Sequence, residues 1–370
     1  MKICVYIPTG SFFVGGGETV PLTQARYLQK IGHEVKVVVT KVEKESEYFQ
    51  NYKKQYPGIA FDYLDSPIPD IENRTLDHKL CHVLYFELSR KFAYYCLSNS
   101  FDVVITHYSV AAIGIPSSIP QILYLHGTPG QYEPVNEAAC QSADKLVAVS
   151  QSVSDGWKAM FQIDKDISVI RNGIDENDFH PALGILKEID ILYIGRLIEI
   201  KGVQHLIEAI RILRDRMNRT DIKVAIYGNG PFKDQLVNQV NQSGLQSLIN
   251  FGGYVETPKL PLLYNRTKLA VFPSYAKEGV LTTMLEAAAS GCCIITSNCC
   301  GMAEFIIDNT NGLLFTPQDP ANLAEKINTA LADNDLRSRL EKQARISILE
   351  AWTWDHAIAK LDKIILELKK

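Results

Sequence analysis

Short apolar runs alternate along the chain with longer segments in which apolar residues recur every three or four positions. The short runs are bounded by Gly, Pro, Asn or Asp and predict buried strands, whereas the longer segments predict helices that cover a sheet. In the first half, this pattern predicts strands at 2–7, 34–39, 102–107, 121–126, 145–150 and 167–174, and helices at 18–31 and 74–98. Strands that alternate with helices are typical of a parallel sheet with crossover helices.

The pattern stops at residues 175–190 and then begins again. This segment contains Pro181 and Gly184 and is the best candidate for a linker. After it, we predict strands at 190–195, 223–228, 249–254, 268–274 and 293–296, and helices at 202–217, 231–243, 281–290, 320–333, 335–350 and 355–370. Two halves of this kind predict an α/β protein with two Rossmann-like domains facing a central cleft.

Composition narrows the classes of function. The chain has 370 residues, which favours two domains of ~100–200 residues each, and 38 basic against 42 acidic side chains give a formal charge of −4. This balance argues against a nucleic-acid partner, because such proteins carry a basic footprint. No apolar run approaches the ~20 residues that cross a bilayer, and the first apolar run is too short for a signal peptide.

The eight cysteines contain no CxxC pair but form two adjacent pairs, Cys292–Cys293 and Cys299–Cys300. Vicinal cysteines do not readily share one tetrahedral site, so we predict no metal centre. Reduced thiols indicate the cytoplasm, or the inner face of its membrane with at most peripheral contact. The sequence assigns these four cysteines no role.

Ligands of parallel sheets bind beyond the carboxyl ends of the strands, and three such places in the second half carry candidate chemistry. Arg196 and Lys201 follow the strand 190–195 and are cations suited to a diphosphate, although two solvated surface cations would look the same. Glu278 and Glu286 bracket a helix start, where the backbone N–H groups of Leu281, Thr282 and Thr283 could bind an anion. Gly228, after the strand 223–228, suits a packing turn and a ligand-facing turn equally.

Two further places lie in the first half. The glycine-rich loop at 15–18, which includes Gly16, lacks the GxGxxG spacing of a nicotinamide dinucleotide site. It could still let a sugar or an acceptor approach the backbone. His126 ends the strand 121–126, and this position favours a functional role over the usual structural one.

Nine motifs in this order resemble the retaining glycosyltransferases of family 4, group 1 enzymes with the GT-B fold. They are GGGE at 15–18, GHEV at 32–35, HG at 126–127, VSQS at 149–152, RNGID at 171–175, GRLIEIKG at 195–202, YGNGP at 227–231, EGVLTTMLE at 278–286 and CGMAEFIIDNTNGLLF at 300–315. The resemblance implies an acceptor-side domain at 1–180, onto which the helix 355–370 packs back, and a nucleotide-sugar-binding domain at 186–354.

The resemblance also implies roles for individual residues. Arg196 and Lys201 would bind the donor diphosphate, Glu286 the ribose, and Glu278 the donor sugar. His126 would lie near the reacting carbon, Gly16 would line the approach to the diphosphate, and the backbone at Tyr254 and Val255 would meet the base. The family needs no metal and no cofactor besides the donor. Two departures, Val280–Leu281 and Cys300–Gly301, replace an aromatic–glycine pair and a double glycine, and they affect the donor-sugar pocket.

The function implied is transfer of a hexose-type sugar from a nucleotide diphosphate sugar, UDP first and GDP next, to a hydroxyl with retention of anomeric configuration. The acceptor would be a carbohydrate or a lipid-linked sugar, as in surface polysaccharide or glycoconjugate synthesis. Two alternatives stay open: a nucleotide-sugar epimerase of the same fold, and a catalytically idle binding subunit of a polysaccharide machine.

Overall fold

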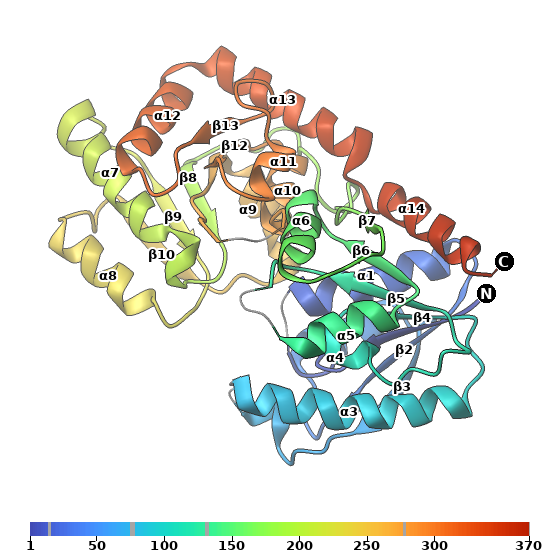
Figure 1. Cartoon of the computed structure of the whole chain (residues 1–370). Helices are drawn as coiled ribbons and strands as arrows, with labels where there is room; N and C mark the ends of the chain where they lie inside the picture. The colour runs from blue at the N-terminus through green and yellow to red at the C-terminus, as the bar shows by residue number, and fades with distance from the viewer. Residues whose placement is uncertain (14–15, 75–77, 130–132, 277–278, 370) are drawn as a thin grey trace. The chain divides into compact units, whose positions relative to one another are not determined.

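The computed structural model describes residues 1–13, 16–74, 78–129, 133–276 and 279–369, and it divides into two units (Figure 1). The first unit comprises Met1–Asn172 together with Trp354–Lys370, and the second comprises Gly173–Thr353. Each unit has a parallel sheet and its own buried core.

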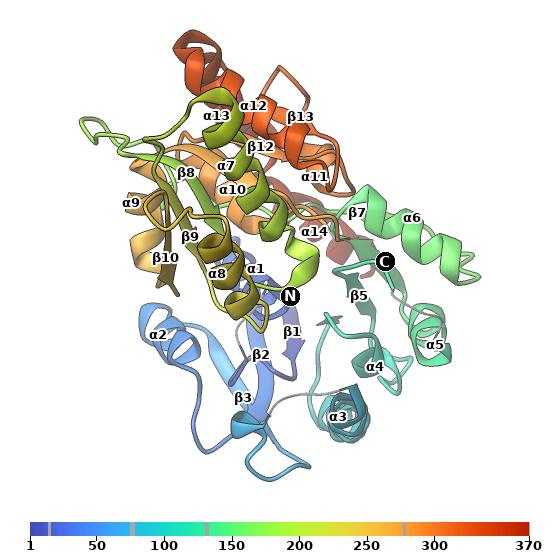
Figure 2. The same cartoon turned by 90° about the vertical axis from the view of Figure 1, so that its left-hand side faces the viewer.

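The first unit contains a seven-stranded sheet in the order β3-β2-β1-β4-β5-β6-β7, and Figure 2 shows β3, β2 and β1 side by side. The strands are β1 (Lys2–Ile7), β2 (Glu34–Lys41), β3 (Ala60–Asp65), β4 (Val103–Thr106), β5 (Gln121–Leu125), β6 (Lys145–Ala148) and β7 (Ile167–Val169). Its helices are α1 (Gly16–Lys30), α2 (Glu47–Gln55), η1 (Ile71–Asn73), α3 (His78–Ser98), α4 (Ser109–Ala112), α5 (Pro134–Ser142), α6 (Gln151–Met160) and α14 (Trp354–Glu367).

The second unit contains a six-stranded sheet in the order β10-β9-β8-β11-β12-β13. The strands are β8 (Ile189–Ile194), β9 (Val224–Tyr227), β10 (Ile249–Gly253), β11 (Thr267–Phe272), β12 (Cys293–Ser297) and β13 (Leu313–Phe315). Its helices are η2 (Glu199–Lys201), α7 (Val203–Met217), α8 (Lys233–Gln242), η3 (Thr257–Lys259), α9 (Leu260–Asn265), α10 (Thr282–Ala289), α11 (Met302–Phe305), α12 (Pro320–Ala332) and α13 (Asn334–Ala351).

Both sheets follow the doubly wound Rossmann order, in which the third, second and first strands are followed by the fourth, fifth and sixth. The order reverses between β1 and β4 in the first unit and between β8 and β11 in the second. A crevice forms where the crossover helices diverge at such a switch point, and ligands bind there. The predicted α/β class with two Rossmann-like domains is confirmed.

The division between the units differs from the predicted boundary at residue 180. Residues 173–180 belong to the second unit, because the N–H of Ile174 donates to the carbonyl of Trp352 at 2.8 Å and Phe179 is buried in that unit's core. The predicted strand 167–174 accordingly ends at Val169 as β7. The last helix begins at Trp354, one residue earlier than predicted.

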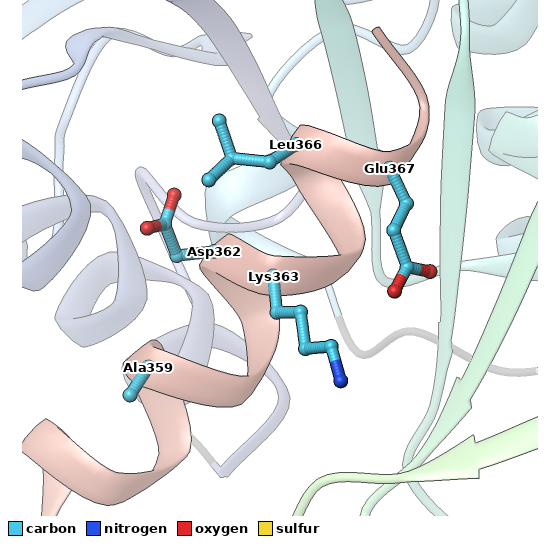
Figure 3. A pocket seen from close by; sticks show the side chains of 5 residues that line it. All are labelled: Ala359, Asp362, Lys363, Leu366 and Glu367. Atoms are coloured by element: carbon cyan, nitrogen blue, oxygen red, sulfur yellow. The ribbon is translucent and has the colours of Figure 1, made fainter. Parts of the chain in front are cut away.

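Helix α14 packs in the first unit against α1, although the whole second unit lies between the two in sequence. Its buried face is apolar and consists of Trp354, Ala357, Ile358, Leu361 and Ile365. Most of its other positions are exposed, and Figure 3 shows Leu366 and Asp362 on one side of the helix and Lys363 on the other, where they line a pocket. The amphipathic period of this helix therefore explains its return to the first unit.

We expect Leu361→Ala to destabilise the first unit by about 2–5 kcal/mol, because a fully buried leucine leaves a cavity when it is truncated. Thermal or denaturant unfolding of the full chain would measure the loss. The matched control is Leu366→Ala in the same helix, since Leu366 is 48% exposed and should change stability little. Equal effects from the two variants would contradict the packing of α14.

Among the described residues, no helix is both long enough and apolar enough to span a bilayer.

Candidate functional site

The loop after β8 brings the first predicted cations to the switch point of the second unit. Arg196 lies exposed just beyond the strand, whereas Lys201, the last residue of η2, is only 7% exposed. The carbonyl of Ile200 accepts a hydrogen bond from the N–H of Tyr275 at 3.0 Å and from the Ser274 hydroxyl at 3.2 Å. The segment that carries Lys201 is thus fixed to the loop that follows β11.

Glycines allow these loops to pack backbone against backbone. Gly202 has a φ of 73°, and a Cβ built on it would lie 2.0 Å from the carbonyl oxygen of Pro273. Gly228 has a φ of 135°, and a Cβ there would lie 1.9 Å from the carbonyl oxygen of Gly195. Contact of this kind excludes every side chain. Packing therefore accounts for glycine at position 228, where the sequence left packing and ligand binding equally open.

Helix α10 begins with no side chain to cap it. Leu281 occupies the N-cap position with extended backbone, and among the described residues the helix has no side-chain cap. Thr282 and Thr283, which open the helix, are half-buried. The predicted helix start at 281 is confirmed to within one residue, and an uncapped N-terminus carries a partial positive charge that suits an anion.

Glu286 lies one turn along α10 from Thr282, and the two residues therefore share a helix face. The hydroxyl of Tyr264 donates to Glu286 Oε2 at 2.8 Å. Burial raises the pKa of Glu286 to about 7, and the Tyr264 hydrogen bond opposes that rise. A carboxylate held by one tyrosine, with oxygen lone pairs left over, can still accept hydrogen bonds from ligand hydroxyls.

Three further residues were predicted as site residues of the second unit: Glu278, Tyr254 and Val255. Glu278 lies outside the described residues. Tyr254 follows β10 and is 65% exposed, whereas Val255 packs against the core. Their predicted contact with a base stays a prediction.

A buried polar cluster lies at the switch point of the first unit. Thr9 follows β1 and donates its hydroxyl to Glu18 Oε1 at 2.7 Å, and the Tyr108 hydroxyl, after β4, donates to the same oxygen. Glu18 is 4% exposed and lies in the first turn of α1, where negative charge is favourable. Burial, followed by the charge of Glu18, raises the pKa of Tyr108 well above its usual value. Gly16, the first residue of α1, lies in the same turn two residues before Glu18.

His126 directly follows β5, as predicted, and pairs with a second histidine. His107 Nδ1 lies 2.7 Å from His126 Nε2, and His107 itself follows the adjacent strand β4. Burial lowers the pKa of His126 to about 4, and burial together with the charge of His126 lowers the pKa of His107 well below its usual value. At neutral pH, the two uncharged rings therefore share one hydrogen bond.

The sequence missed Thr9, Glu18, Tyr108 and His107 as site residues. His107 was interpreted as an ordinary structural histidine. A signal was nevertheless present, because His107 ends a predicted strand and Thr9 and Tyr108 each come just after one. What the sequence lacks is the strand order, which makes β1, β4 and β5 neighbours.

The histidine pair predicts that acid destabilises the first unit. Between pH 6.5 and about pH 4, His126 binds a proton in the unfolded chain but not in the folded chain. The free energy of unfolding should therefore fall as pH drops through that window. The loss should be on the order of 3 kcal/mol. Denaturant unfolding at pH 7 and pH 4 would measure it. In His126→Asn, the free energy of unfolding should depend less on pH, whereas the surface control His180→Asn should behave as the unchanged chain does. An equal pH dependence in the unchanged chain and both variants would contradict the role given to His126.

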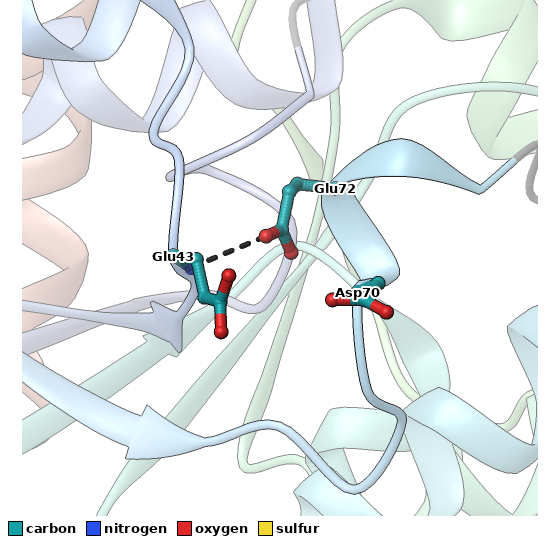
Figure 4. Close-up of side chains that lie close together, drawn as sticks. All are labelled: Glu43, Asp70 and Glu72. Atoms are coloured by element: carbon teal, nitrogen blue, oxygen red, sulfur yellow. Dashed lines mark hydrogen bonds between the residues drawn. The ribbon is translucent and has the colours of Figure 1, made fainter.

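One group of carboxylates in the described part of the chain could in principle hold a metal ion. Glu43, Asp70 and Glu72 lie close together, and the Glu43 N–H donates to Glu72 Oε1 at 3.3 Å (Figure 4). Two of the three are exposed. Exposed acidic groups of this kind are common on protein surfaces, and nothing further points to a ligand here.

Comparison with known protein families shows which family the chain belongs to. A model described as Glycosyl transferases group 1 matches residues 175–347, and a model described as Glycosyltransferase Family 4 matches residues 14–178. Together the two matches run without a gap from residue 14 to residue 347. The chain belongs to the group 1 glycosyltransferases. The predicted resemblance is confirmed, and the chain is a glycosyltransferase of GT-B type.

Individual relatives are similar over most of their length. A glycogen synthase of Mycobacterium tuberculosis is 27% identical over 291 residues, which are 74% of this chain and 69% of that protein. Sucrose-phosphate synthase from Thermosynechococcus elongatus superposes with a TM-score of 0.82 at 17% identity, over 99% of this chain and 98% of that one. Anabaena HepE, solved in complex with UDP, superposes with a TM-score of 0.79 at 19% identity, over 99% and 100% of the two chains. At such identities, the structural likeness shows the GT-B fold alone.

Proposed function

We propose that this glycosyltransferase moves a hexose-type sugar from a nucleotide diphosphate sugar to a hydroxyl acceptor and retains the anomeric configuration. UDP is the first choice of nucleotide and GDP the second. The acceptor is a carbohydrate or a lipid-linked sugar in the synthesis of a surface polysaccharide or glycoconjugate. The reaction takes place in the cytoplasm or at the inner face of its membrane.

The observation that carries this proposal is the set of groups at the switch point of the second unit. Lys201 supplies positive charge in a position with little solvent, and the α10 N-terminus supplies N–H groups without a capping side chain. Both features favour a diphosphate. Glu286, farther along α10, suits the hydroxyl groups of a ribose. We assign the donor sugar to Glu278 and the sugar near its reacting carbon to His126.

In the proposed reaction, the bond between the anomeric carbon and the β-phosphate oxygen breaks, and the nucleoside diphosphate leaves with the electron pair. The acceptor oxygen forms its bond to the same face of the carbon, and its proton passes to the leaving phosphate oxygen. Lys201, Arg196 and the first turn of α10 stabilise the negative charge that develops on the leaving group. These fixed charges take the role that a metal ion would otherwise have, so we propose that no metal is needed.

The relatives support the choice of donor and product. HepE of Anabaena has also been solved with UDP-glucose, and a Staphylococcus aureus protein of similar fold, TarM, with UDP and alpha-GlcNAc-glycerol. The glycogen synthase relative is named for a polysaccharide product. These names favour UDP as the nucleotide and a sugar-bearing hydroxyl as the acceptor.

A thermal-shift panel of UDP-, GDP- and ADP-sugars tests the donor first. The best binder is then incubated with mixed acceptors, and free nucleotide, a mass increase of the acceptor and the anomeric configuration of the product by NMR are measured. We expect the largest shift with a UDP-sugar, and release of UDP that persists in the presence of a chelator. Binding without release would instead indicate an idle subunit, and a changed sugar without a changed acceptor an epimerase; either result would overturn the proposal.

A further inference from the structure

Two adjacent cysteines, Cys299 and Cys300, lie just past the carboxyl end of β12 in the second unit. Their sulfur atoms are 3.1 Å apart, and both residues are half-buried thiols. The other cysteines whose side chains the structure describes are buried, and burial raises their pKa values; they are Cys4, Cys96, Cys140, Cys292 and Cys293. Because thiol reactivity requires access, the half-buried Cys299 and Cys300 stand apart from these five buried thiols.

The other vicinal pair shows why adjacency in sequence is not sufficient. Cys292 and Cys293 lead into β12, where successive side chains point to opposite faces of the sheet. Cys292 accordingly packs in one core cluster and Cys293 in another. Cys300 instead adopts a left-handed conformation with a φ of 48°. With this turn the two sulfur atoms lie on the same side, 3.1 Å apart.

The cysteine turn packs directly against the segment that leads into α10. A Cβ built on Gly301 would lie 2.3 Å from the carbonyl carbon of Gly279 and 2.5 Å from the nitrogen of Val280. The two backbones lie so close that no side chain fits at position 301, so a backbone change that moves Gly301 toward this segment would displace 279–280. The next residue, Leu281, is the N-cap of α10.

We propose that Cys299 and Cys300 form a redox-responsive dithiol site. One thiolate attacks a low-molecular-weight disulfide such as oxidised glutathione and releases one glutathione thiol. The second cysteine then attacks the mixed disulfide and releases the other. Two cysteine thiols lose two electrons and two protons in total, and the small disulfide is reduced to two thiols. Closure of the vicinal disulfide changes the backbone at Cys300 and thereby weakens donor binding at α10; this consequence rests on the proposed function.

Intact-mass analysis of the full chain after incubation with oxidised glutathione tests the chemistry. We expect a loss of about two hydrogen masses that maps to residues 299–300 and is reversed by dithiothreitol. C299S and C300S should each stop at a mixed disulfide with one glutathione. The control C292A/C293A should close its 299–300 pair as the unchanged chain does. No mass change, two stable glutathione adducts, or closure that persists in C299S/C300S would overturn the proposal.

Binding of UDP-glucose, followed by thermal shift before and after oxidation, tests the consequence. We expect roughly tenfold weaker binding after closure, recovered on reduction, and no change for oxidised C299S/C300S. Full closure with unchanged binding would overturn the link to α10. A reduced chain that binds no nucleotide would overturn the proposed function, while the mass measurement would still decide the dithiol chemistry.

Discussion

Lys201→Ala is expected to lower kcat/KM by about 10²–10³, which corresponds to about 3–4 kcal/mol of lost transition-state stabilisation. Lys201 is only 7% exposed and lies beside the switch point, so little water is available to replace its charge. Negative charge on the departing diphosphate grows as the sugar bond breaks. The loss should therefore fall mainly on kcat rather than on KM.

Release of nucleoside diphosphate under saturating donor measures this effect. Lys223→Ala is the matched control, since Lys223 is exposed and precedes β9, at the amino end of the sheet. Lys201→Arg should recover part of the activity, because it keeps the charge but presents a planar fork in place of a compact ammonium. Near-normal turnover of Lys201→Ala would show that Lys201 does not stabilise the departing diphosphate.

The sheet architecture could be predicted from the sequence because parallel strands are buried on both faces. Runs such as 3–7 and 191–194 are apolar throughout and contrast with the amphipathic helices that follow them. The first unit's edge strand β3 was missed for the same reason. It has exposed or half-buried positions along most of its length and includes Asp62, so it lacks the apolar signal.

The sequence did not predict β13 because the strand is too short. It misplaced the boundary between the units because tertiary contacts determine where that boundary lies. β13 has three residues, too few to show a period. The predicted linker 175–190 contains the breaks typical of such a segment, yet Phe179 within it and Ile174 just before it are buried in the second unit. Arg345 Nη1 also donates to the carbonyl of Phe179 at 2.7 Å, a contact between residues far apart in sequence. Local patterns do not report such contacts.

The residues of the candidate site also fall into those that the sequence could predict and those that it could not. Residues on one strand end or one helix start, such as His126 and Thr282, could be found because their places follow from a single element. The partners that tune them come from other elements: His107 beside His126, and Tyr264 beside Glu286. Pairing of this kind depends on strand order and helix packing, which one sequence does not contain.

Glu286 predicts that donor affinity depends on pH. A ribose hydroxyl donates to a carboxylate, so binding favours the ionised form, whereas burial in the free protein raises the pKa of Glu286 to about 7. Affinity for UDP-glucose should therefore fall as pH drops below 7, approaching tenfold per pH unit, and should be constant at higher pH. The phosphates of UDP-glucose do not titrate in this range, so the protein is the source of the dependence.

Glu286→Gln separates this explanation from a structural one. The variant should bind UDP-glucose more weakly at pH 8 and lose the pH dependence of binding, as measured by calorimetry. The surface control Glu256→Gln should keep both the affinity and its pH dependence.

The effect of Glu286→Gln on stability should have the opposite sign to its effect on binding. The raised pKa means that the folded chain holds a proton that the unfolded chain releases between pH 4.5 and about 7, so a buried carboxylate destabilises the second unit above that window. At pH 8, Glu286→Gln should therefore raise the free energy of unfolding by on the order of 3 kcal/mol while it weakens binding. A variant that lost both stability and affinity would show that Glu286 supports the fold rather than the ribose.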